Sequence, residues 1–233
     1  MSCDIEAAGP ARRLHRVARR PDAWAWPDWA YAGPDGTFGN RWDDPRGAYR
    51  VLYASCDRVG AFVEVLARFR PEPAVLRALD EVELERGEDD DGPEPARLPR
   101  AWLAGRVVGT ALADGPFAAV GAARSLAYLR DRLADRALHH GLDELDAAAI
   151  RTHAPRAFTQ EVSRLVFECT DASGEPQFDG IAYRSRLGDE LENRAIFEPP
   201  TGEPRLRDAR SEPVDPDDRD LAAALELLGI KLV

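Results

Sequence analysis

The sequence lacks three features that would place it at once in a common class. It has no apolar run near the roughly 18 residues that cross a bilayer, and its N-terminus, MSCDIEAAGPARRLHR, has no apolar segment of the kind found in signal peptides. It also has no Gly-x-Gly-x-x-Gly or Walker-type loop. We therefore expect a cytoplasmic protein without a membrane partner, and no Rossmann or P-loop nucleotide site.

Cysteine and histidine are scarce as well. The three cysteines, Cys3, Cys56 and Cys169, are odd in number, far apart and without Cys-x-x-Cys spacing. The four histidines show no spacing typical of metal ligands. These patterns suggest neither a disulfide framework nor a metal site.

The charge balance is acidic. Lysine and arginine number 31 against 42 aspartates and glutamates, which gives a net charge of −11. Such a balance argues against direct binding of nucleic acid. Much of the acidity lies in residues 80–94, DEVELERGEDDDGPE, so we expect a mobile acidic insertion over residues 80–95. The alternative is that this segment recruits a basic partner.

The length of 233 residues allows one substantial core, and the apolar patterns alternate irregularly between strand and helix periods. Strands are predicted at 14–17, 48–55, 106–112, 117–120, 178–183 and 195–197. Helices are predicted at 57–70, 124–140, 142–151, 155–169 and 220–232. The fold class is therefore α+β, with small mixed or antiparallel sheets and flanking helices. We expect one domain over residues 1–198, and a C-terminal segment, 199–233, that crosses the surface and ends in a helix.

The central stretch, residues 39–66, combines a turn, a strand and a helix. At 100° per residue, Phe62, Val63 and Leu66 fall on one apolar stripe, while Glu64 lies at its margin or outside it. Helix geometry alone favours a solvated Glu64.

Two blocks of sequence carry a resemblance to a known family. The first is Gly39-Asn40-Arg41-Trp42, then a glycine, then Leu52-Tyr53-Ala54-Ser55 and a helix with Glu64. The second is FDGIAYRSR at 178–186, which contains Ser185, followed by NRAIFE at 193–198. In this order the blocks resemble the RES-domain family, which is named for its arginine, glutamate and serine. The resemblance covers about residues 16–198.

The resemblance implies an ADP-ribosyltransferase-like fold that binds NAD in a cleft between two small sheets. It also implies the toxin component of a RES/Xre-type toxin-antitoxin pair, with an Xre-like antitoxin protein as partner. NAD would be the substrate, with no further cofactor. The residues that match the family pattern are Arg16, Arg41, Tyr53, Glu64 and Ser185, with Arg16 chosen by resemblance from several nearby arginines.

These side chains suit cleavage of the bond between ribose and nicotinamide. The reaction passes through an oxocarbenium-like state, which a carboxylate such as Glu64 stabilises electrostatically. The pyrophosphate needs planar cationic donors, and Arg41 and Arg16 supply them. Tyr53 is expected to stack on a ring of NAD, and Ser185 to donate a hydrogen bond. The predicted function is that of an NAD glycohydrolase or phosphorylase, with Glu64 and Arg41 as the catalytic residues.

Several alternatives stay open. Arg41 could pair with Asp43 or Asp44, Tyr53 could belong to the core, and Ser185 could only cap a turn. The protein could transfer ADP-ribose to a protein acceptor, or bind a nucleotide or a partner without catalysis. The C-terminal helix could dock on the body or on a second subunit, so a homodimer also stays open.

Overall fold

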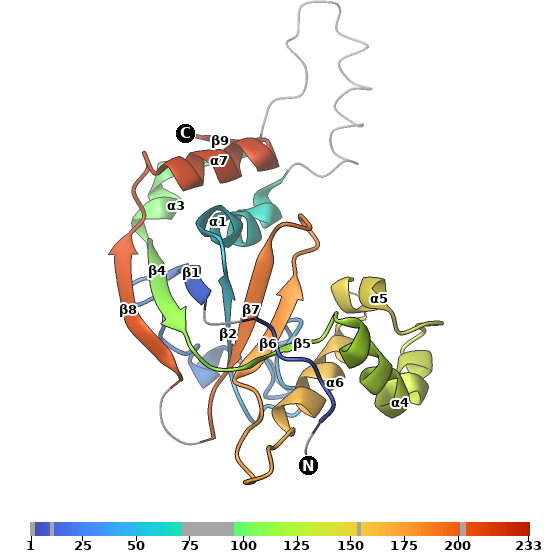
Figure 1. The fold of residues 1–233 in the computed structure, drawn as a ribbon. Helices are drawn as coiled ribbons and strands as arrows, with labels where there is room; N and C mark the ends of the chain where they lie inside the picture. The colour runs from blue at the N-terminus through green and yellow to red at the C-terminus, as the bar shows by residue number, and fades with distance from the viewer. Residues whose placement is uncertain (1–2, 10–11, 71–95, 153–154, 201–203) are drawn as a thin grey trace, which may run out of the picture.

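The structure is a computed structural model that describes residues 3–9, 12–70, 96–152, 155–200 and 204–233. The chain forms a twisted sheet with one group of helices at each end (Figure 1). The acidic segment 80–94 lies outside the described residues, so the expected mobile insertion stays a prediction.

The main sheet has seven strands in the order β5-β6-β7-β2-β1-β4-β8. All neighbouring pairs are antiparallel except β5 and β6, which are parallel. A second sheet pairs two short strands, β3 and β9, in parallel. The strands are β1 (Arg12–Arg19), β2 (Val51–Ser55), β3 (Ala96–Leu98), β4 (Arg106–Ala113), β5 (Phe117–Ala119), β6 (Gly180–Arg184), β7 (Glu192–Phe197), β8 (Leu206–Pro213) and β9 (Ile230–Leu232). The expected α+β class, with a mostly antiparallel sheet and flanking helices, is confirmed.

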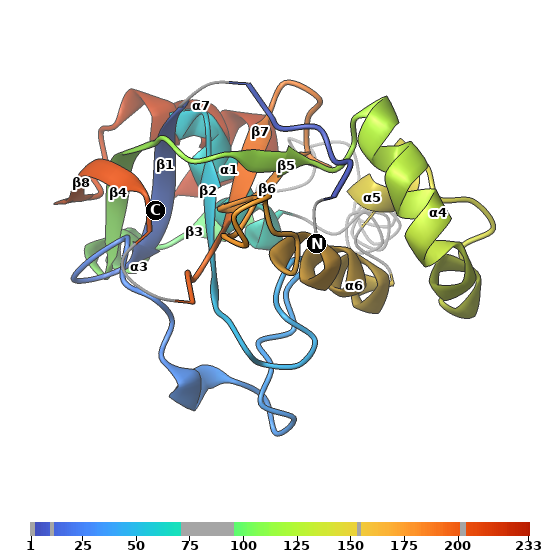
Figure 2. The same ribbon diagram turned by 60° about the horizontal axis from the view of Figure 1, so that its bottom comes forward.

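The helices fall into two groups. At one end α1 packs on α7, and at the other α4, α5 and α6 lie together (Figure 2). Their bounds are α1 (Arg58–Leu66), α3 (Arg100–Ala104), α4 (Ala123–His139), α5 (Ala147–Arg151), α6 (Arg156–Phe167) and α7 (Arg219–Leu228), with two 3-10 helices, η1 (Trp29–Tyr31) and η2 (Ala67–Phe69). Within the described residues, no helix combines the length and apolar character that a membrane span requires.

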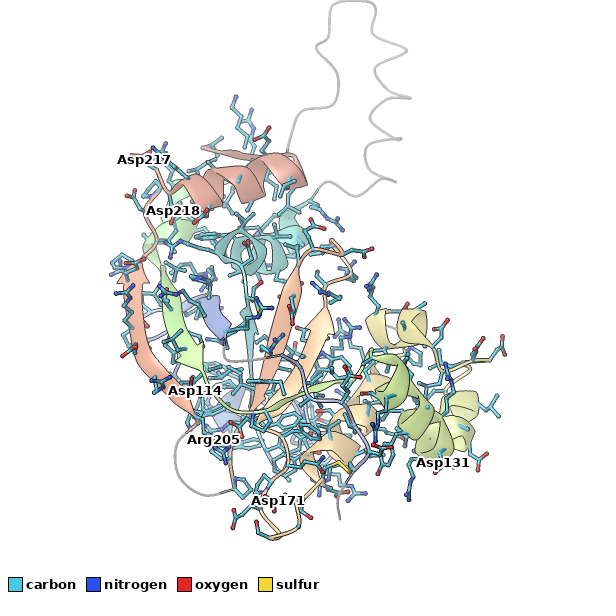
Figure 3. The ribbon with its side chains drawn as sticks, in the orientation of Figure 1. Asp114, Asp131, Asp171, Arg205, Asp217 and Asp218 are labelled. Atoms are coloured by element: carbon cyan, nitrogen blue, oxygen red, sulfur yellow. A yellow bond between two sulfur atoms is a disulfide. The ribbon has the colours of Figure 1, made fainter. Side chains whose placement is uncertain are left out.

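The described residues form three apolar clusters, and two of them bury the helix stripes. The predicted stripe of α1, Phe62, Val63 and Leu66, is buried in a cluster that also contains residues of α7. The stripe of α6 lies in the larger cluster under β6 and β7. The side chain of Asp218 caps α7 and pairs with Arg58 of α1 at 2.5 Å, which joins the two helices (Figure 3). Burial of these stripes supplies most of the stabilisation of both helices.

The C-terminal tail differs from its predicted course. It was expected to cross the surface between residues 199 and 218, but it contains β8, which pairs with β4 at the edge of the main sheet. Most side chains of β8 are exposed, so its sequence has no apolar alternation from which a strand could be predicted.

The cysteines also correct the sequence-based prediction. Cys3 and Cys169 form a disulfide, although they lie 166 residues apart in sequence. The N-terminal segment runs beside β5 through an Ala7–Ala118 bridge, and the Gln177 side chain hydrogen-bonds to the backbone of Cys3. The pairing therefore depends on tertiary contacts, which the spacing of cysteines in the sequence cannot show.

Candidate active site

Four of the five predicted site residues line a single cavity of about 400 Å³. They are Arg16 of β1, Arg41, Tyr53 of β2 and Glu64 of α1. The fifth, Ser185, contacts Glu64 from behind the cavity. The lining residues are His15, Arg16, Val17, Asn40, Arg41, Tyr53, Ala54, Ser55, Ala61, Glu64, Val65, Arg156, Tyr183, Arg186 and Asn193. The volume is typical of a small-molecule site.

The carboxylate of Glu64 is held by two buried donors. Its Oε1 atom accepts a hydrogen bond from the hydroxyl of Ser185 at 2.5 Å and another from the side-chain amide of Asn193 at 2.7 Å. Ser185 and Asn193 are each only 1% exposed, whereas the Glu64 side chain is exposed to the cavity. The carboxylate therefore has a fixed orientation toward the space that a ligand would occupy.

Helix α1 presents Glu64 because its start is fixed. Asp57 caps the helix, and its side chain accepts a hydrogen bond from the Gly60 amide. Phe62 and Val63 then turn toward the core, and Glu64 turns toward the cavity, as the helical period requires.

Ser185 has two roles. Its hydroxyl accepts a hydrogen bond from the Leu187 amide at 3.0 Å, which stabilises the turn after β6, and donates to Glu64. The turn-capping alternative is therefore present in the geometry. The hydrogen bond that Ser185 was expected to donate to a ligand goes to Glu64 instead.

Asn193 is a site residue that the sequence analysis did not select. It lies on β7, with Ser55 of β2 opposite on one side and Tyr183 of β6 on the other. While its amide nitrogen binds Glu64, its buried Oδ1 atom has no hydrogen-bond partner in the described part of the chain. A buried acceptor without a partner is costly, and this cost falls on the residue whose amide nitrogen holds Glu64.

Arg41 does not pair with either aspartate that follows it. Its guanidinium donates to the Ile150 carbonyl and lies over the rings of Trp42 and Tyr183, at 5.1 and 5.3 Å from the ring centroids. Burial lowers the pKa of Arg41, although the nearby Glu64 opposes this shift. The guanidinium therefore has a fixed position in the cavity wall, and no described carboxylate forms an ion pair with it.

Tyr53 orients the loop that carries Arg41. Its hydroxyl donates to Asp43 at 2.8 Å and accepts from the Trp42 amide at 2.9 Å, while its ring lines the cavity. Burial raises the pKa of Tyr53 well above its usual value and also raises the pKa of Asp43. Tyr53 thus remains neutral and positions the loop.

The cavity is cationic although the protein is acidic. Its lining contains four arginines, Arg16, Arg41, Arg156 and Arg186, and a single carboxylate, that of Glu64. Burial lowers the pKa of Arg16 to about 10, so it stays charged at neutral pH. Arg186 lies in the block already noted at 178–186, whereas nothing in the sequence pattern marks Arg156. This composition favours an anionic ligand.

The comparisons with known proteins agree with the sequence motifs. Residues 13–112 match the family model of the RES domain. The resemblance to the RES family is therefore confirmed over the stretch that contains Arg16, Arg41, Tyr53 and Glu64. Among solved structures, a chain of the M. tuberculosis MbcT-MbcA toxin-antitoxin complex is similar at 14% sequence identity and a TM-score of 0.49, over 95% of this chain and 91% of that chain. No curated protein matches the sequence.

The described residues contain no cluster of side chains that could bind a metal ion. Among the described residues, no three His, Cys, Asp or Glu side chains lie close enough together to hold a metal ion. The polar groups available for chemistry in the described cavity include the Glu64 carboxylate, its two hydrogen-bond donors and the arginines.

Proposed function

We propose that this protein cleaves the bond between nicotinamide and ribose in NAD, and that it acts as the toxin of a toxin-antitoxin pair. One observation carries the proposal. Among the described lining residues Glu64 supplies the one carboxylate, which is fixed by Ser185 and Asn193 in a cavity whose other charged side chains include several arginines. A dinucleotide combines the two features that such a cavity recognises, a pyrophosphate and a ribose at which positive charge develops.

Glu64 supplies the electrostatic stabilisation. As the bond from C1′ to the pyridinium nitrogen breaks, its electron pair goes to nicotinamide, which leaves as a neutral molecule and needs no proton. Positive charge then develops on the ribose, and a carboxylate with a fixed orientation stabilises it without reorganisation. The hydrogen bonds from Ser185 and Asn193 maintain that orientation.

The arginines supply binding. Arg41 is held by the Ile150 carbonyl and by two aromatic rings, so its free N–H groups are already aligned before a ligand arrives. A planar guanidinium binds two phosphate oxygens at once, which an ammonium group cannot do. Arg186, in the loop after β6, belongs to the same lining. The Arg16 guanidinium instead donates to the Ala23 carbonyl, on the face of the sheet away from Val17 and α1.

The ADP-ribosyl acceptor defines the reaction class. Water would make the protein an NAD glycohydrolase, and inorganic phosphate would make it a phosphorylase. The alternatives are transfer to a protein acceptor, and a catalytically silent protein that binds a nucleotide or a partner with the same residues. The resemblance to the RES family supports an Xre-like antitoxin protein as the partner. A homodimer is proposed as a second form of association.

The test is incubation of the purified protein with NAD, with and without inorganic phosphate. Nicotinamide release measures cleavage, and mass spectrometry distinguishes ADP-ribose, its phosphate ester and ADP-ribosylated protein. Release that requires Glu64 supports the proposal. No release under any of these conditions, together with measurable NAD binding, would leave the silent nucleotide-binding protein as the better account.

A further inference from the structure

A second cavity, of about 350 Å³, adjoins the first. Arg41 and Tyr183 belong to the lining of both cavities, so this pair lies between the two spaces. The second cavity lies between the N-terminal segment, β5, β6 and α5, and small side chains dominate its surface. Gly121 and Ala147 are two of these small residues that are exposed.

The two cavities differ in charge. The second contains Arg151 and Arg184 besides Arg41, but Arg151 pairs with Asp189 at 2.6 Å and Arg184 lies 4.0 Å from Glu192. Glu192, which also lines this cavity, is held by Arg194 at 2.8 Å. Its positive charges are therefore compensated within the protein, whereas those of the first cavity are largely not. An uncharged ligand group suits the second cavity better than a phosphate does.

The arrangement matches a molecule with two halves. NAD consists of two nucleosides of similar size joined by a pyrophosphate, and the two cavities have similar volumes and share one guanidinium in their linings. Because Glu64 lies in the first cavity, the reacting ribose belongs there. We propose that the second cavity binds the adenosine half of NAD, with the pyrophosphate on Arg41 between the two halves. This inference rests on the proposed function.

The chemistry of the second cavity fits adenosine. Its small side chains leave room for a flat ring system, and the fixed carboxylate of Glu192 accepts hydrogen bonds from ribose hydroxyls or from the exocyclic amine of adenine. The Tyr183 ring at the boundary offers an aromatic surface for contact. The same features would not distinguish adenosine from other purine nucleosides, so the ligand class is a purine nucleoside carrying a 5′-pyrophosphate.

The test uses ADP, which contains this half and the pyrophosphate but no reacting bond. Ala147→Trp places a large side chain in the second cavity, and Ala148→Trp is its matched control, because Ala148 is an exposed neighbour on α5 outside the cavity lining. A second filling variant is Gly121→Trp, since a Cβ atom at Gly121 meets no atom within 4 Å. Calorimetry on the full-length protein gives the ADP affinity of each variant, and a thermal melt confirms that each is folded.

We expect Ala147→Trp and Gly121→Trp to weaken ADP binding by about tenfold or more, the scale of one lost anchoring contact, with Ala148→Trp close to the parent. In cleavage assays the filling variants should lose kcat/KM for NAD and keep it for nicotinamide mononucleotide, which lacks the adenosine half. Folded filling variants that bind ADP like the parent, or a parent that does not bind ADP, would overturn the inference. A protein that binds ADP through this cavity but never releases nicotinamide would instead overturn the proposed reaction.

Discussion

The hydroxyl of Ser185 lies 2.5 Å from the Oε1 atom of Glu64, although the two residues are 121 positions apart in sequence. Asn193 donates to the same oxygen atom from the neighbouring strand. Two residues that come much later in the sequence therefore orient the Glu64 carboxylate on α1. Each prediction about the reaction follows from this contact or from the arginines around it.

Replacing Glu64 by glutamine keeps the size of the side chain and an acceptor oxygen for Ser185 and Asn193, but removes the negative charge. We expect kcat for NAD cleavage to fall by about 10² or more while NAD affinity changes little, because the lost interaction belongs to the transition state. Steady-state kinetics and a thermal melt measure both effects. Glu226→Gln, at an exposed position on α7, is the matched control. Parental turnover in Glu64→Gln would remove the catalytic assignment.

Asn193→Asp places a second carboxylate where an amide nitrogen now donates to Glu64 at 2.7 Å. Two adjacent carboxylates resist joint ionisation, so the apparent pKa of the pair rises. Since the reaction requires ionised Glu64, the acidic limb of the kcat profile should move to higher pH. Asn193→Ala should lower kcat and move that limb less, because it removes a donor to the carboxylate but adds no second negative charge. Equal pH profiles for parent and Asn193→Asp would show that Asn193 does not act through Glu64.

Arg41→Lys keeps the positive charge but loses the parallel N–H donors of the planar guanidinium. A lysine cannot both donate to the Ile150 carbonyl and present two parallel N–H groups to phosphate. We expect NAD binding to weaken by about 1–3 kcal/mol, the scale of a charge-assisted hydrogen bond. Calorimetry measures the change, with Arg46→Lys, an exposed arginine outside the cavity lining, as control. Unchanged affinity would assign Arg41 to loop structure alone.

The disulfide gives a prediction about stability. Alkylation of the unfolded, unreduced protein should modify only Cys56, and reduction should expose Cys3 and Cys169 as well. In a Cys56→Ser background, reduction should lower the free energy of unfolding by about 2–4 kcal/mol, because the bond restricts the unfolded chain. Urea unfolding with and without reductant measures this. Three reactive thiols before reduction would contradict the pairing.

Much of the fold could be predicted because its elements bury one face. The helices around Glu64 and at 124–140 and 155–169 show clear apolar stripes, and α1, α4 and α6 form there. Strand β8 could not be predicted, since a polar edge strand is specified by its hydrogen bonds to β4 and not by its side chains. The Cys3–Cys169 pair was missed for a similar reason, since only tertiary contacts bring its members together.

The site was predictable where a motif marks a residue. Arg41, Tyr53 and Glu64 line one cavity and Ser185 contacts Glu64, whereas the Arg16 guanidinium binds the Ala23 carbonyl. Their proposed roles remain predictions. Tyr53 illustrates the limit, because its hydroxyl is engaged by Asp43 and Trp42, a contact that no spacing in the sequence indicates. Asn193 was overlooked although it stands in a quoted block, since an asparagine within a strand carries no periodic signal.

Strand β7 lies between β6 and β2, near the middle of the sheet (Figure 1), and this position sets when the site can form during synthesis. At about 5–20 residues per second, the ribosome needs roughly 6–24 s to pass from Glu64 to Ser185. Until β6 and β7 emerge, β2 has an open edge and the Glu64 carboxylate has neither of its donors. A nascent or truncated chain that ends before residue 180 therefore carries Glu64 without its geometry, so a cell that makes this protein meets the complete site only after β7 has been synthesised.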